Sequence, residues 1–145
     1  TLICFEDTVA DICRDFVRGG ARLLINQTND AWFDRTAAPV QHLSHCVLRC
    51  VENRVPAIRV ANSGITCLID DRGAVHDPTA NSRRTPPRPE VRVWPVAPAA
   101  SGTLTFYTRY GDMPFALPCA AVALVTLAAA WLQARRRRET ADGGN

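Results

Sequence analysis

The sequence contains no lysine, because all 17 of its basic residues are arginine. No residue of the chain can therefore take a role that requires a lysine. No glycine-rich phosphate loop follows any predicted strand, which argues against a dinucleotide-binding fold. The arginines do not interleave with aromatic residues, and four of them form one cluster, Arg135 to Arg138. This pattern does not favour nucleic-acid binding.

The six cysteines lack the spacing and density of a small disulfide-stapled scaffold. They lie in apolar or helical surroundings, at positions 4, 13, 46, 50, 67 and 119. Cysteine in such surroundings behaves as a small apolar side chain. We therefore expect most of them to be buried thiols.

One long uncharged run, residues 113–132, lies near the C-terminus. At about 1.5 Å per helical residue it spans about 30 Å, the thickness of a bilayer's hydrocarbon core. Trp131 lies at its end and the arginine cluster follows directly. By the positive-inside rule we expect a transmembrane helix over 113–133 and a basic cytoplasmic tail over 134–145, which leaves residues 1–112 extracytoplasmic. The alternative is a buried, alanine-rich core helix.

Residues 1–112 alternate strand-like and helix-like patterns, which predicts an α/β domain with helices on one face of a sheet. Gly19 and Gly20 end the first predicted helix, Asp7 or Thr8 caps its start, and Pro56 stops the second. The chain also has a tight turn at 71–73 and a Pro/Arg-rich loop at 78–89. The predicted strands are 1–5, 21–28, 57–62, 66–71, 74–77 and 90–96, and the predicted helices are 6–20 and 40–55.

Cys4 ends the first predicted strand just before a helix. Amides at a helix N-terminus stabilise a thiolate and can form an oxyanion hole, so this position suits a nucleophile. The neighbouring Glu6 and Asp7 would disfavour the thiolate, and a positive partner is therefore required. The other interpretation is an ordinary buried cysteine at a strand end.

Two further groups carry chemistry-bearing side chains. The first consists of His42, His45, Cys46 and Cys50 on one predicted helix, which either binds zinc or packs its thiols inward. The second is the stretch "NQTNDAWF", a strand end followed by two aromatic residues. It either lines a ligand site or forms a capped turn with its aromatic residues folded under. The polar and aromatic candidates there are Asn26, Asn29, Asp30, Trp32 and Phe33.

Several stretches together resemble the C-terminal part of the apolipoprotein N-acyltransferase family, in the nitrilase (carbon–nitrogen hydrolase) superfamily. They are "ICFED", "NQTNDAWF", "PVQHL", "LRCVENRVPAIRVANSGIT", "DDRG" and "YTRYGD", followed by the apolar run. The combination of "NDAWF", "YTRYGD" and a following membrane span is specific, whereas a cysteine two residues before a glutamate is not.

The resemblance implies the C-terminal half of an αββα sandwich, a Cys–Glu–Lys triad and a place in a bacterial inner membrane with the domain facing the periplasm. Cys4 matches the nucleophile, the Phe5 backbone N–H would contribute to the oxyanion hole, and Glu6 matches a supporting acid. Asn29, Asp30, Trp32 and Phe33 would contact substrate. The implied partners are a phospholipid acyl donor, a diacylglyceryl lipoprotein acceptor and the membrane. No cofactor, metal or nucleic acid is implied.

The sequence departs from the family in three respects. The base Glu and the Lys of the triad precede the cysteine segment in the family, Asp34 stands where the family has glycine, and the family's N-terminal membrane helices are missing from these residues. The chain does not begin with Met, so we expect a fragment or a processed product, inactive alone and with one apolar sheet face bare. Two alternatives stay open: another nitrilase-superfamily amidase, and a non-catalytic single-span membrane protein that binds lipid or a partner through Trp32.

Overall fold

The structure, a computed structural model, describes residues 1–33, 36–79, 91–102 and 104–142, with side chains described as far as Arg135. Asp34 and residues 80–89 of the predicted loop lie outside the described residues. The chain forms two compact units, Thr1–Arg109 and Tyr110–Asn145.

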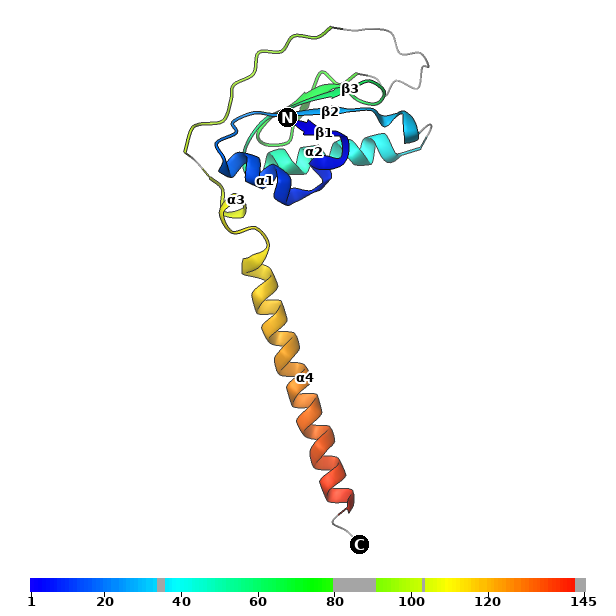
Figure 1. The fold of residues 1–145 in the computed structure, drawn as a ribbon, viewed down its shortest axis with the longest axis vertical. Coiled ribbons are helices and arrows are strands. Elements are labelled where there is room, and N and C mark those ends of the chain that lie inside the picture. The colour runs from blue at the N-terminus through cyan, green and yellow to red at the C-terminus, as the bar shows by residue number, and fades with distance from the viewer. Residues whose placement is uncertain (34–35, 80–90, 103, 143–145) are drawn as a thin grey trace. The chain divides into compact units, whose positions relative to one another are not determined.

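The first unit is built on one sheet with the strand order β1-β2-β3-β4-β5. The first three strands are parallel to one another, and the last two are added antiparallel. Figure 1 shows this sheet in the upper part of the view. The strands are β1 (Leu2–Ile3), β2 (Leu24–Thr28), β3 (Ala57–Ala61), β4 (Cys67–Ile69) and β5 (Val75–His76).

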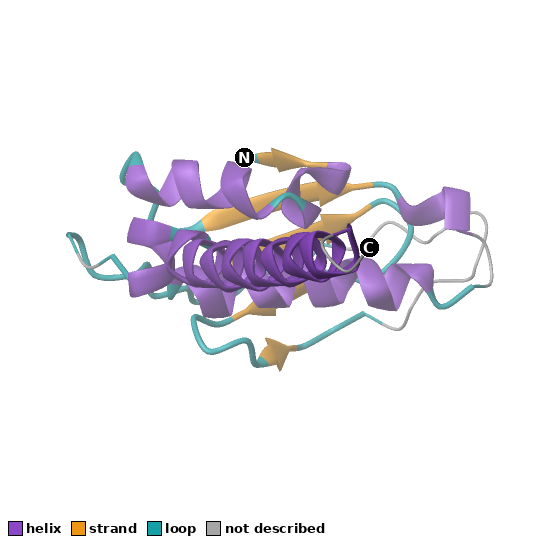
Figure 2. Cartoon of the chain, turned by 90° about the horizontal axis from the view of Figure 1, so that it is seen from below, coloured by secondary structure: helices purple, strands orange, loops and turns teal. Residues whose placement is uncertain are grey.

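Two helices, α1 (Ala10–Arg18) and α2 (Ala38–Asn53), connect the parallel strands. Figures 1 and 2 show both of them on the same face of the sheet. Proline in the first turn favours the start of α2, and Arg54 ends it in the left-handed conformation. One sheet with one helical layer is half of an αββα sandwich, which confirms the predicted fold class.

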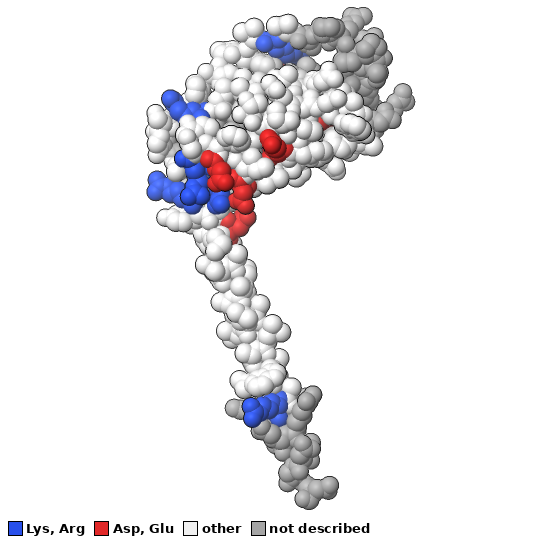
Figure 3. Space-filling model, in the orientation of Figure 1, with Lys and Arg blue, Asp and Glu red and all other residues white. Residues whose placement is uncertain are grey.

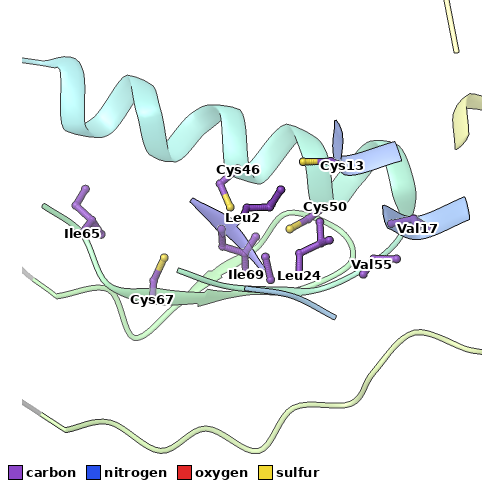
Figure 4. Packing of buried hydrophobic residues seen from close by; sticks show 11 residues of the cluster. Leu2, Cys13, Val17, Leu24, Cys46, Cys50, Val55, Ile65, Cys67 and Ile69 are labelled. Carbon is purple, nitrogen blue, oxygen red and sulfur yellow. The ribbon is translucent and has the colours of Figure 1, made fainter. Parts of the chain in front are cut away.

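The core lies between these helices and the sheet, as Figure 4 shows. Four of its residues are free thiols: Cys13, Cys46, Cys50 and Cys67. Burial raises the pKa of Cys13 to about 12 and that of Cys67 to about 11, so these thiols stay protonated at neutral pH. The prediction of buried thiols is confirmed for these four, whereas Cys119 is exposed and Cys4 is partly exposed.

The opposite face of the sheet is largely apolar. The strand register places Ile3, Gln27 and Val60 in one row and Ile25, Ile58 and Leu68 in the next. Ile3 is 55% exposed and Val60 is 45% exposed. An apolar face of this kind is normally covered by another layer of structure.

Three sequence predictions were wrong in detail. No strand forms over the described residues 91–100, where Pro95 and Pro98 lack N–H groups and Val91 and Val93 are fully exposed. The first strand ends at Ile3, since a 3-10 helix, η1 (Cys4–Thr8), begins at the cysteine. The cap of α1 is Val9, with no side-chain hydrogen bond, rather than Asp7 or Thr8.

A short helix, α3 (Phe106–Tyr110), follows the irregular segment 91–102. Two threonines bind it to the end of α2: the Thr105 hydroxyl donates to Glu52 O at 2.6 Å, and the Thr108 hydroxyl donates to Asn53 Oδ1 at 2.9 Å. Thr108 and Asn53 are both completely buried.

The last helix, α4 (Met113–Asp142), contains one stretch long and apolar enough to cross a membrane, Met113–Arg135. None of the apolar window is buried in the protein, and Figure 3 shows it without charged side chains until its end. There Arg135 lies over the Trp131 ring, 5.8 Å from the ring centre. Its length, composition and exposure indicate association with a membrane.

Candidate active site

Cys4 lies in a strained backbone conformation at the end of β1. Its φ is +51°, in the left-handed region that costs a non-glycine residue about 1–2 kcal/mol. Two hydrogen bonds hold the turn. The Ile3 N–H donates to Glu6 Oε2 at 2.8 Å, and the Asn26 side-chain amide donates to Cys4 O at 3.0 Å. Strain held in place by specific partners makes this a candidate functional turn. We call Cys4–Thr8 the nucleophile turn, after the role that the sequence predicts for Cys4.

The Cys4 thiol meets one hydroxyl. Thr28 Oγ1 lies 3.5 Å from Cys4 Sγ and 3.0 Å from Asp30 Oδ1. Asn26 and Thr28 are two residues apart on β2 and both are buried, so they lie on the same face of the sheet. One of them fixes the backbone of Cys4 and the other contacts its sulfur.

Beneath the turn, four fully buried side chains form a closed ring of alternating charge, which we call the charge ring: Asp7, His42, Asp30 and Arg59. His42 lies between the carboxylates, with Nε2 at 2.8 Å from Asp7 and Nδ1 at 2.9 Å from Asp30. Arg59 closes the ring, with Nη1 at 2.9 Å from Asp7 and Nη2 at 3.0 Å from Asp30. Two negative and two positive charges compensate one another, which is what burial of ions requires.

His42 is doubly protonated in this ring, because both of its nitrogens face carboxylate oxygens and must donate. Burial alone would lower the pKa of His42, but the hydrogen bonds to Asp30 and Asp7 outweigh it and raise the pKa to about 9. Burial would raise the pKa of Asp30; the hydrogen bond from His42 and the charge of Arg59 outweigh it and lower that pKa. His42 and Asp30 are therefore both charged at neutral pH.

Aromatic side chains cover the ring. Phe5 stacks on His42 with ring centres 4.7 Å apart and planes 15° apart. Phe33 meets Phe5 edge-on at 5.6 Å. A cation beneath an aromatic face is favourable, and the Phe5 ring also shields the His42 imidazolium from water. Phe5 is itself 52% exposed, so its outer face is open to solvent.

The stretch "NDAWF" forms a second 3-10 helix, η2 (Asp30–Phe33), beside the nucleophile turn. Asn29 is exposed and its side chain accepts from the Ala31 N–H; Trp32 is 86% exposed. Asp30 is 2% exposed, and its placement in the charge ring does not fit the predicted contact with substrate. Gly64, with φ +118°, makes room for Asp30: a Cβ there would lie 2.5 Å from Asp30 Oδ2.

The two histidines and two cysteines of α2 lie in different surroundings. His42 joins the charge ring, Cys46 and Cys50 join the core, and His45 is exposed. Among the described residues, no group of three or more His, Cys, Asp or Glu side chains is placed to hold a metal ion.

A separate pocket of about 640 Å³ lies between residues 94–100 and the strands β4 and β5. Leu68, Asp70, His76 and Trp94 help to line it, and Cys4 does not. The exposed Asp70 carboxylate accepts from His76 at 3.0 Å, and this hydrogen bond leads the causes that lower the pKa of Asp70 to about 2.

Sequence reasoning missed the parts of the site that lie below the surface. Arg59 occupies an inward position of the otherwise apolar strand β3, and Thr28 is buried at the end of β2. A charged residue at such a position requires a buried counter-charge, and that signal would have pointed to Asp7 or Asp30.

Comparison with known proteins gives a consistent assignment. The carbon–nitrogen hydrolase family matches residues 1–85. A Geobacter metallireducens protein named apolipoprotein N-acyltransferase is 47% identical over 130 residues, covering 90% of this chain and 23% of that protein. A Treponema denticola protein named apolipoprotein N-acyltransferase 1 is 38% identical over 128 residues, covering 88% and 22%. These matches confirm the resemblance drawn from the sequence.

The chain thus spans less than a quarter of the length of these curated relatives. Among solved structures, Saccharomyces cerevisiae Nit3, a member of branch 10 of the nitrilase superfamily, matches with a TM-score of 0.48 and 18% identity. That match covers 55% of this chain and 32% of the yeast chain.

Proposed function

Because the chain belongs to the carbon–nitrogen hydrolase family, we propose that it is the nucleophile-bearing part of an apolipoprotein N-acyltransferase. The observation that carries the proposal is Cys4, held in a strained turn by Asn26 and Thr28 and partly exposed beside an aromatic surface. The names of the relatives supply the reaction class.

The proposed reaction has two steps at Cys4. The thiolate attacks the ester carbonyl of a phospholipid, the C–O bond breaks, and the lysophospholipid leaves with a proton. The acyl chain is then a thioester on Sγ. The α-amine of a diacylglyceryl-cysteine attacks that thioester, the C–S bond breaks, and the amide product leaves a free thiolate after losing a proton. In both steps the Phe5 backbone N–H would contribute to binding the oxyanion, and Glu6 would support the turn.

We assign the general base to no residue here, because in the family it precedes the cysteine segment. The lysine has no counterpart either, since the chain contains no lysine. Arginine does not replace lysine, because its pKa is too high and its charge is spread over a planar fork. We therefore expect the 145 residues alone to be inactive, and expect activity only where the missing groups are supplied.

The proposed setting is a bacterial inner membrane. Residues 1–112 would form the partial hydrolase domain in the periplasm, 113–133 the membrane span and 134–145 the cytoplasmic tail. The arginine cluster directly after the span supports this orientation. The exposed Trp32, with Asn29 and Phe33 beside it, would meet the lipid acyl chains.

The first experiment is the mass of the native protein in its own membranes, detected with an antibody against "TANSRRTPPRPE". A species much larger than 15.9 kDa would agree with the proposal. That species is then incubated with a fluorescent phospholipid, and Cys4 is examined for a thioester. Cys4→Ser should abolish the adduct, while Cys119→Ser, the same change on the exposed face of α4, should leave it unchanged.

A second candidate is a non-catalytic membrane protein that binds lipid through Trp32. Its support is the 86% exposure of Trp32 together with the absence of lysine. A native species of 15.9 kDa would favour this candidate. Trp32→Ala should then abolish binding of a short-chain phospholipid to the chain in detergent, whereas Cys4→Ala and Trp94→Ala should not.

A further inference from the structure

Thr28 has one hydroxyl proton and two acceptors within reach. Asp30 Oδ1 lies 3.0 Å from Thr28 Oγ1, and Cys4 Sγ lies 3.5 Å from it. A single O–H cannot donate to both atoms at once. Which acceptor receives the proton therefore depends on the charge that each one carries.

Asp30 is the stronger acceptor while Cys4 is a thiol. It is a carboxylate in the charge ring, and a charge-assisted hydrogen bond is stronger than a bond to neutral sulfur. Thr28 then presents its lone pairs to Cys4, where they can accept the thiol S–H. When Cys4 loses its proton, Sγ becomes a charged acceptor as well and can compete for the Thr28 proton.

Asp30 keeps its other hydrogen bonds in the charge ring when the Thr28 hydroxyl rotates away. The same Oδ1 atom that receives the Thr28 hydroxyl also accepts from His42 Nδ1 at 2.9 Å. Oδ2 is bound to Arg59 at 3.0 Å. Asp30 therefore keeps two charged donors after Thr28 turns away, and no buried carboxylate is left unpaired.

The charges around the sulfur do not select the thiolate by themselves. The charge ring is neutral in sum, and the remaining carboxylate, Glu6, is engaged with the Ile3 N–H. Among the described residues, Thr28 supplies the one hydrogen bond to Sγ. The charged groups packed around Cys4 and Thr28 are Glu6 and Asp7 of the nucleophile turn, Asp30 of η2, His42 of α2 and Arg59 of β3.

We propose that Thr28 is a proton toggle beside the nucleophile: its hydroxyl donates to Asp30 while Cys4 is a thiol, and rotates to donate to Sγ when Cys4 is a thiolate. Thr28 keeps its own proton throughout. The thiol proton leaves to solvent in the free chain and to the general base in the proposed reaction. This inference deepens the proposed function, on which it rests, by naming a residue that stabilises the reacting sulfur.

The test is the pH dependence of Cys4 alkylation by iodoacetamide, in the full 145-residue chain in detergent micelles. Peptide mass spectrometry resolves each cysteine. The four buried core thiols report the state of the fold, because they react only when the first unit opens.

Thr28→Val keeps the shape of the side chain and removes the hydroxyl. We expect the alkylation midpoint of Cys4 to rise by about one pH unit, and its rate at neutral pH to fall about tenfold. Thr28→Ser should restore both. Thr36→Val removes a hydroxyl that donates to Phe33 O and accepts from the Ala38 N–H, away from Cys4, and it should leave the Cys4 midpoint unchanged.

A Cys4 midpoint in Thr28→Val that is unchanged or lower would overturn the proposal. If the buried thiols of that variant react, the comparison of Thr28→Ala with Thr28→Ser decides by the same criterion. The alkylation assay contains no phospholipid. The Thr28 proposal can therefore be refuted while thioester formation is observed in the longer species, and thioester formation can be absent while the Thr28 proposal holds. The two proposals can therefore be refuted separately.

Discussion

Removing Arg59 tests whether the charge ring holds the first unit together. Its guanidinium makes two charge-assisted hydrogen bonds, to Asp7 at 2.9 Å and to Asp30 at 3.0 Å, and all three side chains are fully buried. Hydrogen bonds to charged groups contribute about 1.5–3 kcal/mol each. Loss of one partner from a buried ion pair costs about 3–5 kcal/mol, so Arg59→Met should lower the free energy of unfolding by that amount.

This loss is a large part of the total stability of a domain, which is typically about 5–15 kcal/mol. The measurement is urea unfolding of the full chain in detergent. Unfolding is monitored through the alkylation of the buried thiols, Cys13, Cys46, Cys50 and Cys67. The deficit of Arg59→Met should shrink as the pH falls, because protonation of one carboxyl removes the uncompensated charge.

Arg18 supplies the matched control. It pairs with Asp15 at 3.8 Å, and the two side chains are 52% and 71% exposed. Arg18→Met should cost less than about 1 kcal/mol, as exposed ion pairs do. An Arg59→Met loss no larger than that of Arg18→Met would refute the structural role of the ring.

Three further predictions concern the same unit. The pKa of His42 is about 9 in the folded chain, against its ordinary value of 6.5 in the unfolded chain, so stability should fall between those pH values by about 3 kcal/mol in urea titrations. Gly64→Ala should cost about 3 kcal/mol by urea unfolding, since its Cβ would meet Asp30 Oδ2 at 2.5 Å. Thr108→Val should cost about 1–3 kcal/mol in the same assay, because it removes the hydrogen bond to the buried Asn53 side chain.

Two controls separate these effects from general damage. Gly20→Ala shares a positive φ with the Gly64 change, but no heavy atom lies within 4 Å of its Cβ, so it should cost only about 1 kcal/mol. His76→Ala removes a half-exposed histidine and should leave the fall in stability above pH 6.5 in place. A Gly20→Ala loss as large as that of Gly64→Ala, or a flat pH profile with His42 intact, would contradict the respective prediction.

The sequence predicted the parts of the fold that repeat a local pattern. The helix at 38–53 carries apolar residues at helical spacing, and the strands at 24–28 and 57–61 begin with apolar residues, so a short window reveals them. The segment 90–96 also alternates apolar residues, but strand formation needs a neighbouring strand, and alternation does not report whether one is present.

The charge ring was beyond such reasoning for a different cause. Asp7 meets His42 across 35 residues and Arg59 across 52 residues, so no local window contains the partners. Cys4 was singled out by its position before a helix, and the structure adds the positive φ that a strand pattern does not encode. His42 was considered for metal binding because its chemistry is visible in the sequence, whereas its two carboxylate partners are not.

The long sequence separation within the charge ring also bears on the order of folding. The ring joins the nucleophile turn, η2, α2 and β3, and its contacts are closed only after β3 has docked beside β2. Contacts between distant residues carry a larger loop-closure cost and form late. During synthesis Cys4 emerges near the start of these residues, yet the surroundings that distinguish it from the other thiols exist only after residue 59 is in place. The geometry around Cys4 is thus a late product of folding, and a partly folded chain carries an ordinary cysteine at that position.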